Sequence, residues 1–516
     1  MRRVSSRPAD PPAVRTSLLL QRYLASAQPG QLAPGAVAFF AGLEAIGAVS
    51  PNIAASIVRE LADQRSNLKL IASENFCSLA VQLAQGNLFT DKYAEGYAGH
   101  RFYAGCDNVD AVELEAAGLA RDLFGASYAY VQPHSGADAN LVAFLAILSA
   151  TVESPALEKL GQTNPAAVTA DDWARLRAEF VGQRLLGMDY YSGGHLTHGY
   201  RHNVSSLLFE AHSYKVDRET MLLDYDAIRA QAREVRPRIL LAGYSAYSRR
   251  IDFARLREIA DEVGATFMVD MAHFAGLVAG KVFTGEFDPV PYAHVVTTTT
   301  HKTLRGPRGG IVLSTEEFAP AIDKGCPMVL GGPLPHVMAA KAVALREALR
   351  PDFQRYAHAV VENARTLAQE LVKHGVRVVT GGTDNHIVLV DVAASYGLTG
   401  RQAESALRSC GMTLNRNSLP FDVNGPWYTS GLRIGSPAIT TLGMGADEIT
   451  EIADIIVSVL AQVTPKTTTG EDGVSKVSKA HFGLPEATAD AARQRVQDLL
   501  QRFPLYPEID LGLAFG

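Results

Sequence analysis

A run of valines and threonines at residues 295–300, followed closely by Lys302, constrains what this chain can fold into more than any other stretch. Its β-branched residues predict a strand, and the Gly- and Pro-rich residues 306–310 predict a turn into another apolar run. A lone lysine at a strand end is usually a solvated surface group. A second predicted strand, residues 266–269, however, ends in Asp270. An acid and an amine at strand ends suit pyridoxal phosphate, because the acid keeps the pyridine nitrogen protonated and the amine forms a Schiff base.

The composition excludes several other classes of protein. With 516 residues, 47% of them apolar, the chain can bury a large core and form two or more domains. Its formal net charge of -6 argues against nucleic acid as the main partner, so small molecules are expected. The four cysteines lie far apart without a C-x-x-C pair, which predicts no metal site, no disulfide framework and a cytoplasmic location.

The chain is expected neither to enter a membrane nor to carry a targeting signal. Asp, Arg, Gly or Pro interrupts each apolar run before it is long enough to span a bilayer. Residues 1–16 are rich in Arg, Pro and Ser and are predicted to be a disordered extension.

Alternating strand and helix patterns predict a mostly parallel α/β sheet, followed by a smaller α+β region. Helices are expected at 17–27, 35–46, 51–64, 110–124, 136–150, 226–234, 252–263, 336–349, 400–410, 447–463 and 487–503. Further strands are expected at 238–242, 376–379 and 387–390, and a polar linker at 464–478. Residues 151–183 are predicted to be a surface insert with a short helix capped at Thr169.

A series of ordered motifs between about residues 68 and 449 resembles the serine hydroxymethyltransferase family. They are L-I-A-S-E-N at 70–75, K-Y-A-E-G-Y at 92–97, V-Q-P-H-S-G at 131–136, G-G-H-L-T-H-G at 193–199, S-A-Y-S at 245–248, V-D-M-A-H-F-A-G at 269–276, the residues at 297–310, and S-G-L-R at 430–433. The resemblance implies an aminotransferase-like fold of type I with a mostly parallel seven-stranded sheet. It further implies an N-terminal arm (1–67), a large cofactor-binding domain (68–345) and a small C-terminal domain (346–516).

The resemblance assigns the binding site for pyridoxal 5'-phosphate. Lys302 is implied to hold the cofactor covalently, and Asp270 to keep its ring protonated. The predicted helix start at Gly136 offers backbone donors to the phosphate. The other implied cofactor residues are Ser135, Ala137, His195, Ser245, His273 and, from a neighbouring subunit, Gly332.

The resemblance also assigns residues that bind and convert the substrate. Arg433 offers a bidentate guanidinium to the amino-acid carboxylate, assisted by Ser73 and Tyr93. Glu95 is implied to transfer a proton to or from the serine hydroxyl and folate. The remaining catalytic candidates are Tyr103, close to the Schiff base, and Thr299 and His301, which influence reaction specificity. Tetrahydrofolate is implied to bind at Tyr190, Gly194, Leu196, Asn417, Gly425, Pro426 and Trp427.

The implied reaction is the reversible transfer of the serine hydroxymethyl group to tetrahydrofolate, giving glycine and 5,10-methylenetetrahydrofolate, in a homodimer or tetramer with shared active sites. Three positions depart from the family pattern: Phe102 replaces a tyrosine, Tyr190 a leucine and Leu330 a glutamine. They keep open a folate-independent aldolase for threonine-type 3-hydroxy amino acids on the same site. A catalytically silent scaffold or RNA-binding relative is the rival of another class, disfavoured by the intact set of predicted catalytic residues.

Overall fold

The computed structural model describes residue 14 and residues 17–27, 32–469 and 475–515. The chain divides into two compact units, one formed by residues up to 68 together with 493–516 and the other by residues 69–492. Every residue predicted for the active site belongs to the second unit. The predicted domain boundary at residue 345 stays a prediction, as does the disordered extension at residues 1–16, nearly all of which lies outside the described residues.

The first unit is helical. Its helices are α1 (Leu19–Ser26), α2 (Pro34–Val49), α3 (Pro51–Ser66) and α22 (Gly512–Phe515), and α21 (Glu486–Arg502) enters it from residue 493 onward. The rings of Tyr23 and Phe40 pack 5.1 Å apart between α1 and α2. Arg65 at the end of α3 donates to the carbonyl of Leu505 at 2.7 Å. The three N-terminal helices and the helix at 487–503 are thus confirmed.

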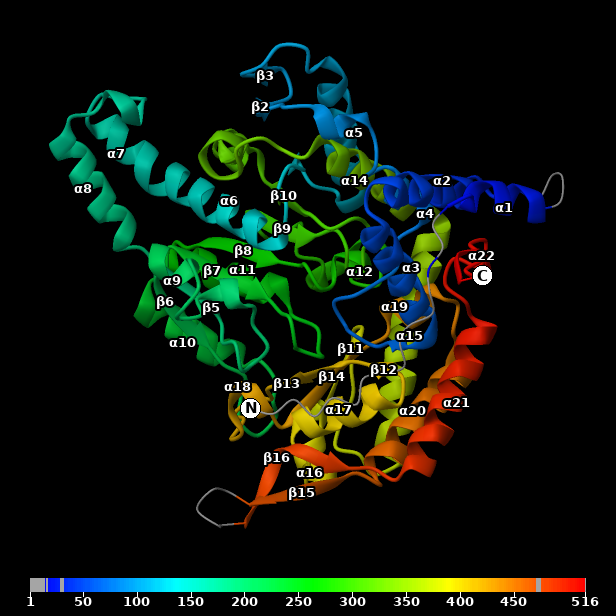
Figure 1. Ribbon diagram of the computed structural model, residues 1–516. Coiled ribbons are helices and arrows are strands. Elements are labelled where there is room, and N and C mark those ends of the chain that lie inside the picture. The colour runs from blue at the N-terminus through cyan, green and yellow to red at the C-terminus, as the bar shows by residue number, and fades with distance from the viewer. Residues whose placement is uncertain (1–13, 15–16, 28–31, 470–474, 516) are drawn as a thin grey trace. The chain divides into compact units, whose positions relative to one another are not determined.

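A seven-stranded sheet forms the centre of the second unit (Figure 1). Its strands, in spatial order, are β4 (Tyr128–Tyr130), β10 (Gly310–Ser314), β9 (Val295–Thr299), β8 (Thr266–Asp270), β7 (Ile239–Gly243), β5 (Arg184–Met188) and β6 (Glu210–Tyr214). The five strands from β9 to β6 run parallel, whereas β10 is antiparallel to both of its neighbours. The predicted mostly parallel sheet of seven strands is confirmed.

Helices cover both faces of this sheet because alternate residues of each strand point to opposite sides. On one face, Met268 and Val295 pack with the apolar residues of α6 (Gly136–Leu148). On the other face, Phe267 and Val296 join the core formed with α5 (Asp107–Phe124), α10 (Tyr225–Val235) and α11 (Phe253–Val263). Since β8 and β9 are parallel, with Asp270 paired to Thr297, their carboxyl ends meet at one edge of the sheet.

A smaller antiparallel sheet lies towards the C-terminal end of the second unit. Its order is β11 (Ile387–Asp391), β14 (Gly431–Gly435) and β13 (Asn415–Asn417). The helices of this region are α14 (Pro335–Ala348), α15 (Pro351–Lys373), α16 (Val392–Tyr396), α17 (Gly400–Ser409), α18 (Gly425–Tyr428), α19 (Pro437–Thr441) and α20 (Ala446–Leu460). The predicted change from α/β to α+β is confirmed.

Shorter elements complete the unit. They include α4 (Leu79–Leu83), the hairpin of β2 (Gly96–Tyr97) and β3 (His100–Arg101), α7 (Ser154–Lys159), α8 (Ala170–Val181), α9 (Ser205–Leu208), α12 (Ala275–Ala279), α13 (Ala319–Asp323), the π-helical turn η7 (Cys326–Leu330) and β12 (Met412–Thr413), while β1 (Leu68–Lys69) spans the boundary between the units in the sequence. In the predicted insert, the Thr169 hydroxyl accepts a hydrogen bond from the Asp172 amide, so the predicted cap of α8 is confirmed.

Three local predictions are wrong. Residues 376–379 form only a single bridge, from Val378 to Val390, before a 3-10 turn begins at Val379. The predicted linker at 464–478 instead contains paired strands, β15 (Thr464–Thr469) and β16 (Ser475–Gly483), which suit its β-branched threonines. Helix α5 begins at Asp107 rather than Asp110, because the Asp110 carboxylate accepts from Arg101 and the Gly99 amide instead of forming a cap.

One helical stretch among the described residues is long and apolar enough to cross a membrane. It runs for 24 residues from Gly136 to Lys159 through α6 and α7, and its most apolar window of 18 residues has a mean hydropathy of 1.5. The prediction that no apolar run reaches this length is wrong. Within its most apolar window 61% of the stretch is buried inside the protein, where α6 packs on the sheet. It is therefore the core helix of the second unit.

Candidate active site

Lys302 lies just beyond the end of β9, at the edge where the carboxyl ends of the parallel strands meet. Its Nζ donates to the Thr299 hydroxyl at 3.1 Å, and that hydroxyl donates to the Ala272 carbonyl at 3.1 Å. The Asn75 amide donates to the Lys302 carbonyl at 2.9 Å and fixes the turn from the other side. Burial lowers the pKa of Lys302 to about 8, with Asp270 opposing the shift and Arg433 adding to it. The amine is therefore close to its reactive neutral form.

Asp270 is held as a permanent carboxylate on the neighbouring strand. Its Oδ2 accepts from Asn140 Nδ2 at 2.9 Å and lies 3.1 Å from His198 Nε2, while its Oδ1 accepts from the Ala272 amide at 3.0 Å. Burial raises the pKa of Asp270, but the hydrogen bond and charge of His198 and the neighbouring His195 outweigh it and hold that pKa well below its usual range. Such a group can keep a pyridine nitrogen protonated.

Asn140 is fixed by its own partners. It accepts from Thr297 Oγ1 at 2.5 Å and donates to Thr197 Oγ1 at 2.8 Å. Residues of α6, β9 and the turn at 195–198 therefore converge on one carboxylate. The potential metal-ligand atoms of His195, His198 and Asp270 also lie within 4.8 Å of one another, close enough to bind one metal ion.

Two histidines near Asp270 and Lys302, His195 and His273, are neutral at ordinary pH. Burial lowers the pKa of His195 to about 4, and its Nδ1 lies 2.7 Å from Thr197 Oγ1. Burial, with the positive charges of Lys302 and Arg433, holds the pKa of His273 well below its usual value. The His273 ring stacks on His386, with centroids 5.5 Å apart. A neutral ring can lie against an aromatic cofactor without a charge penalty.

His301 occupies the turn beside Lys302. Burial lowers its pKa to about 3, with the Lys302 and Arg308 charges adding to the effect. Its Nδ1 is buried and has no hydrogen-bond partner among the described residues. This leaves a polar atom available to a ligand beside the lysine.

The start of α6 provides a seat for an anion next to Lys302. Ser135 caps the helix by accepting from the Asp138 amide at 3.1 Å, which leaves the first amides of the helix, at Gly136 and Ala137, open to a phosphate. A Cβ atom at Gly136 would lie 2.6 Å from Thr299 Cγ2, so glycine is required by the close approach of the two segments. The predicted phosphate and aldehyde sites are thus adjacent.

These features fit pyridoxal 5'-phosphate. The site offers an ionised carboxylate for the ring nitrogen, an amine with a lowered pKa for the aldehyde, and a helix start for the phosphate. In addition, His134 Nε2, next to the phosphate seat, is buried and finds no hydrogen-bond partner in the part of the chain that the structure describes.

Arg433, on β14, turns its guanidinium towards the same edge. Its Nη1 donates to the Ser245 carbonyl at 2.6 Å and its Nε to Asn415 Oδ1 at 3.1 Å. Burial lowers its pKa to about 10, with Tyr190 opposing the shift, so the group remains charged at neutral pH. The segment of Ser73 lies against β14, because a Cβ atom at Gly435 would lie 2.3 Å from Ala72 Cα.

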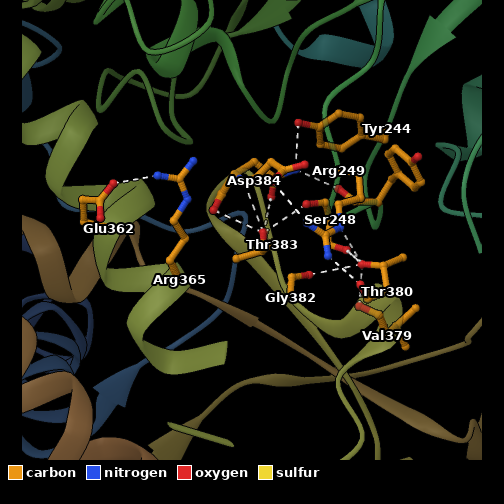
Figure 2. A network of polar contacts seen from close by, with 12 residues as sticks. Tyr244, Ser248, Arg249, Glu362, Arg365, Val379, Thr380, Gly382, Thr383 and Asp384 are labelled. Carbon is orange, nitrogen blue, oxygen red and sulfur yellow. Dashed lines mark hydrogen bonds and ion pairs between the residues drawn. The ribbon is translucent and has the colours of Figure 1, made fainter. Parts of the chain in front are cut away.

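A polar network holds the loop that carries Ser245 (Figure 2). Arg249 donates to both the hydroxyl and the carbonyl of Thr380 and pairs with Asp384 at 3.1 Å. Figure 2 shows Thr383 of the same segment bonded to the Ser248 carbonyl, at 3.1 Å. The network ties residues 244–249 to residues 380–386 and so sets the positions of Ser245 and His386.

A second group of predicted residues gathers around the hairpin of β2 and β3. The rings of Tyr93 and Tyr103 lie 4.8 Å apart, and Tyr93 Oη lies 3.5 Å from Glu95 Oε2. A Cβ atom at Gly332 would lie 3.1 Å from the Tyr93 ring. Both tyrosines are about half exposed, Tyr93 by 54% and Tyr103 by 49%. Figure 1 shows this hairpin well apart from β8 and β9.

Arg101 fixes the backbone on either side of Glu95. The buried guanidinium donates from Nη1 to the carbonyls of Ala94 and Gly96, each at 2.9 Å. Its other nitrogens pair with Asp110, at 2.8 Å, and with Glu113. The position of Glu95 is therefore set from behind by a buried ion network.

The predicted folate residues lie on three segments. Position 194 requires glycine, because a Cβ atom there would lie 2.0 Å from the Met188 carbonyl. Leu196, two residues further on, is about half exposed. Asn417 ends β13 and is half-buried. Helix α18 contains Gly425, Pro426 and Trp427, whose ring is 62% exposed and lies beneath the guanidinium of Arg401 at 5.4 Å.

The three departures from the family pattern occupy different surroundings. Phe102 is 70% exposed beside the Glu95 hairpin, whereas Leu330 is half-buried at the end of η7. The Tyr190 ring packs on Tyr191 and Tyr200, with centroids 5.4 and 5.2 Å away.

Sequence reasoning missed residues that support the site from within. Among them are Asn140, His198, Thr197, Asn75 and His386. Signals were available for four of them, since Asn140 follows Gly136 by one helical turn, Asn75 lies in the motif at 70–75, and Thr197 and His198 lie in the motif at 193–199. No comparable local signal marks His386.

Comparisons with known proteins match the chain to one family. The family model described as serine hydroxymethyltransferase matches residues 46–158 and 178–456. The chain is 60% identical over 474 residues to a serine hydroxymethyltransferase of Mycolicibacterium smegmatis, covering 92% of this chain and 95% of that protein. It is 59% identical over 492 residues to one of Treponema pallidum (95% and 85%) and 53% identical over 495 residues to one of Chlamydia trachomatis serovar D (96% and 99%).

The matched residues span the sheet, the Lys302 turn and Arg433, and the family predicted from the sequence motifs is confirmed. The gap in the family match, residues 159–177, falls within the predicted insert. The chain therefore belongs to the serine hydroxymethyltransferase family, whose fold is that of the type I pyridoxal-phosphate enzymes.

Proposed function

We propose that this protein interconverts serine and glycine, transferring the hydroxymethyl group of serine to tetrahydrofolate and back. The observation that carries the proposal is the convergence of Lys302, Asp270 and Arg433 at one sheet edge, close enough for the charges of Asp270 and Arg433 both to act on the Lys302 amine. Pyridoxal phosphate, when bound, supplies an electron sink for the carbanion at the substrate α-carbon.

The residues around Lys302 bind different parts of the cofactor and the substrate. Lys302 binds the cofactor aldehyde through Nζ, which Thr299 orients, and Asp270 holds the proton on the ring nitrogen. Arg433 binds the substrate carboxylate with the donors that Ser245 and Asn415 leave open, and Ser73 lies on the adjoining segment. The neutral His195 packs on the cofactor ring, and His273 and Ser245 border its oxygen.

Glu95 moves the proton of the substrate hydroxyl, assisted by Tyr93 and Tyr103. Because these residues and Gly332 lie on a half-exposed surface, we assign them to the site of a neighbouring subunit. The active form is then a homodimer or a tetramer of such dimers, in the cytoplasm. Tetrahydrofolate binds between the turn of Tyr190, Gly194 and Leu196 and the far wall of Asn417 and α18.

A folate-independent aldolase acting on threonine-type substrates remains the second candidate. Tyr190 favours it, because the aromatic cluster that this side chain forms with Tyr191 and Tyr200 stands on the side assigned to the pteridine.

Glycine production from serine, measured with and without tetrahydrofolate, separates the two. The proposal expects turnover that depends on tetrahydrofolate and little cleavage of threonine-type substrates. Equal glycine production in both arms contradicts the folate-dependent transfer, and faster cleavage of a threonine-type substrate establishes the aldolase.

A further inference from the structure

A lysine that the proposed reaction does not use is buried beneath the site. Lys341, on α14, is 1% exposed. Its Nζ donates to three backbone carbonyls, those of Val131 at 2.6 Å, Pro133 at 2.9 Å and Gly310 at 2.9 Å. Within the described residues it forms no ion pair. Burying an ammonium group without a carboxylate costs free energy, so the three carbonyl bonds must serve a purpose that an apolar side chain could not.

The three carbonyls belong to the two segments that form the cofactor site. Val131 and Pro133 lie between β4 and the phosphate seat at Ser135 and Gly136, whereas Gly310 begins β10 at the end of the Lys302 turn. The Pro133 carbonyl also accepts from the Gly310 amide, at 2.9 Å. Lys341 therefore bonds to both sides of a seam between the phosphate seat and the Lys302 turn.

Close packing along this seam depends on two glycines. A Cβ atom at Gly309 would lie 2.5 Å from Lys341 Cε, and one at Gly310 would lie 2.3 Å from the Ser135 carbonyl. The backbone therefore approaches the lysine and the phosphate seat as closely as it can.

The seam continues to the reacting amine. The Thr300 amide donates to the Gly309 carbonyl at 3.1 Å, and Thr300 separates Thr299 from the turn that carries Lys302. On the opposite side of the seam, Gly136 touches Thr299, whose hydroxyl accepts from Lys302 Nζ. A shift at Gly309 or Gly310 would therefore move Lys302 relative to the start of α6.

We propose that Lys341 is a positioning residue that fixes the separation between the phosphate seat and Lys302, so that one cofactor molecule reaches both. The inference rests on the proposed cofactor site and deepens it. Lys341 touches neither cofactor nor substrate. It acts through the carbonyls of Val131, Pro133 and Gly310.

The charge of Lys341 supports this role. Burial lowers its pKa to about 7, and the nearby carboxylates of Glu113 and Asp138 oppose the shift. A phosphate dianion at the start of α6, close in sequence to Pro133, would add a further negative charge and favour the charged form. The three bonds would then be strongest when the cofactor is bound.

The test is cofactor binding to the full-length apoprotein, followed by absorbance, with pyridoxal 5'-phosphate and with pyridoxal, which lacks the phosphate. In Lys341→Met the affinity for pyridoxal phosphate should fall by about tenfold or more. The affinity for pyridoxal should change much less, because that molecule has no phosphate to reach the seat at the start of α6 and so does not depend on the separation between that seat and Lys302. Lys281→Met is the matched control, since Lys281 also donates to a backbone carbonyl, that of Leu123, at 3.4 Å.

A second variant covers the case in which Lys341→Met does not fold. Gly309→Ala keeps the amine but pushes against Lys341 Cε, and should reduce the preference for pyridoxal phosphate over pyridoxal in the same direction. Preferences equal to wild type in the folded variants would overturn the positioning role, even if the melting temperature of the apoprotein falls. A wild-type protein that binds neither compound would overturn the proposed cofactor site as well.

Discussion

The residues around Lys302 and those around Glu95 belong to the same compact unit, but they are built differently. Asp270 is buried, Lys302 is half-buried, and the partners that orient both lie in the chain itself. Glu95 is held from behind, where Arg101 binds the neighbouring carbonyls, and its carboxylate accepts a long hydrogen bond from Tyr93, but Tyr93 and Tyr103 are themselves about half exposed. On the proposed assignment, one chain holds the residues around Lys302 in place by itself, whereas it presents the proton-transfer group to the site of another chain.

The largest expected effect is on the Lys302 side. Lys302→Ala should remove the visible absorbance of the bound cofactor and reduce serine turnover to below about one thousandth of wild type, because the covalent anchor is lost. Absorbance spectra and glycine production measure the two effects. Undiminished turnover in this variant would remove Lys302 from the centre of the site.

Glu95→Gln should separate the two regions. Loss of proton transfer is expected to lower kcat by about 100-fold to 10,000-fold, while affinity for pyridoxal phosphate and its visible spectrum stay as in wild type. Cofactor titration of the apoprotein and steady-state kinetics provide both values. A variant that also loses the cofactor would show that Glu95 belongs to the Lys302 group.

His198→Asn tests the support of Asp270. Without the hydrogen bond and charge of His198, the pKa of Asp270 should rise towards its usual range, and kcat should fall by about tenfold through weaker ring protonation. The acid limb of the pH profile of kcat should move to higher pH. An unchanged pH profile together with a lower melting temperature would mean that His198 only packs the core.

Cofactor capture by the apoprotein should depend on pH through Lys302. Its pKa is lowered to about 8 in the folded chain, and only the neutral amine attacks an aldehyde. The capture rate should therefore be nearly constant above about pH 9 and fall about tenfold for each pH unit below about 7. Stopped-flow absorbance measures it. A rate that still rises through pH 10 would contradict the lowered pKa.

The smallest effect is expected at Arg101. Arg101→Lys keeps the charge but cannot bond both carbonyls and both carboxylates, so kcat should fall by about threefold to tenfold with cofactor affinity unchanged. Arg257→Lys is a matched control, because Arg257 also joins a carboxylate, Asp261, to a backbone carbonyl, that of Tyr292. Equal effects of the two substitutions would deny Arg101 a specific role.

Much of the fold could be predicted because its signals are local. The β-branched run at 295–300 and the acid-ended strand at 266–270 encode both the strands and their ends, and a glycine at 125, with φ of 71°, ends α5 where it was expected. The errors arose where a side chain found a distant partner. The sequence suggests Asp110 as a helix cap, but Arg101 binds its carboxylate. The threonines that suggested a polar linker instead form one strand of a hairpin.

The candidate site was likewise predicted only where local motifs mark its residues. Motifs identified Lys302, Asp270 and Arg433, but Asn140 and Lys341 act only through contacts made after folding. Nor could spacing along the chain show that Glu95 and Lys302 belong to separate groups, since that depends on where the hairpin of β2 and β3 lies.

We propose that the group around Lys302 and the group around Glu95 are halves of one active site, contributed by different chains. Mixing inactive Lys302→Ala with inactive Glu95→Gln, after allowing subunits to exchange, tests it directly by serine-to-glycine turnover. With equal amounts of the two variants, half of the dimers should contain one chain of each. One of the two sites in such a dimer is intact, so about a quarter of wild-type activity should return. A mixture that remains as inactive as its components, despite proven exchange, would contradict the claim.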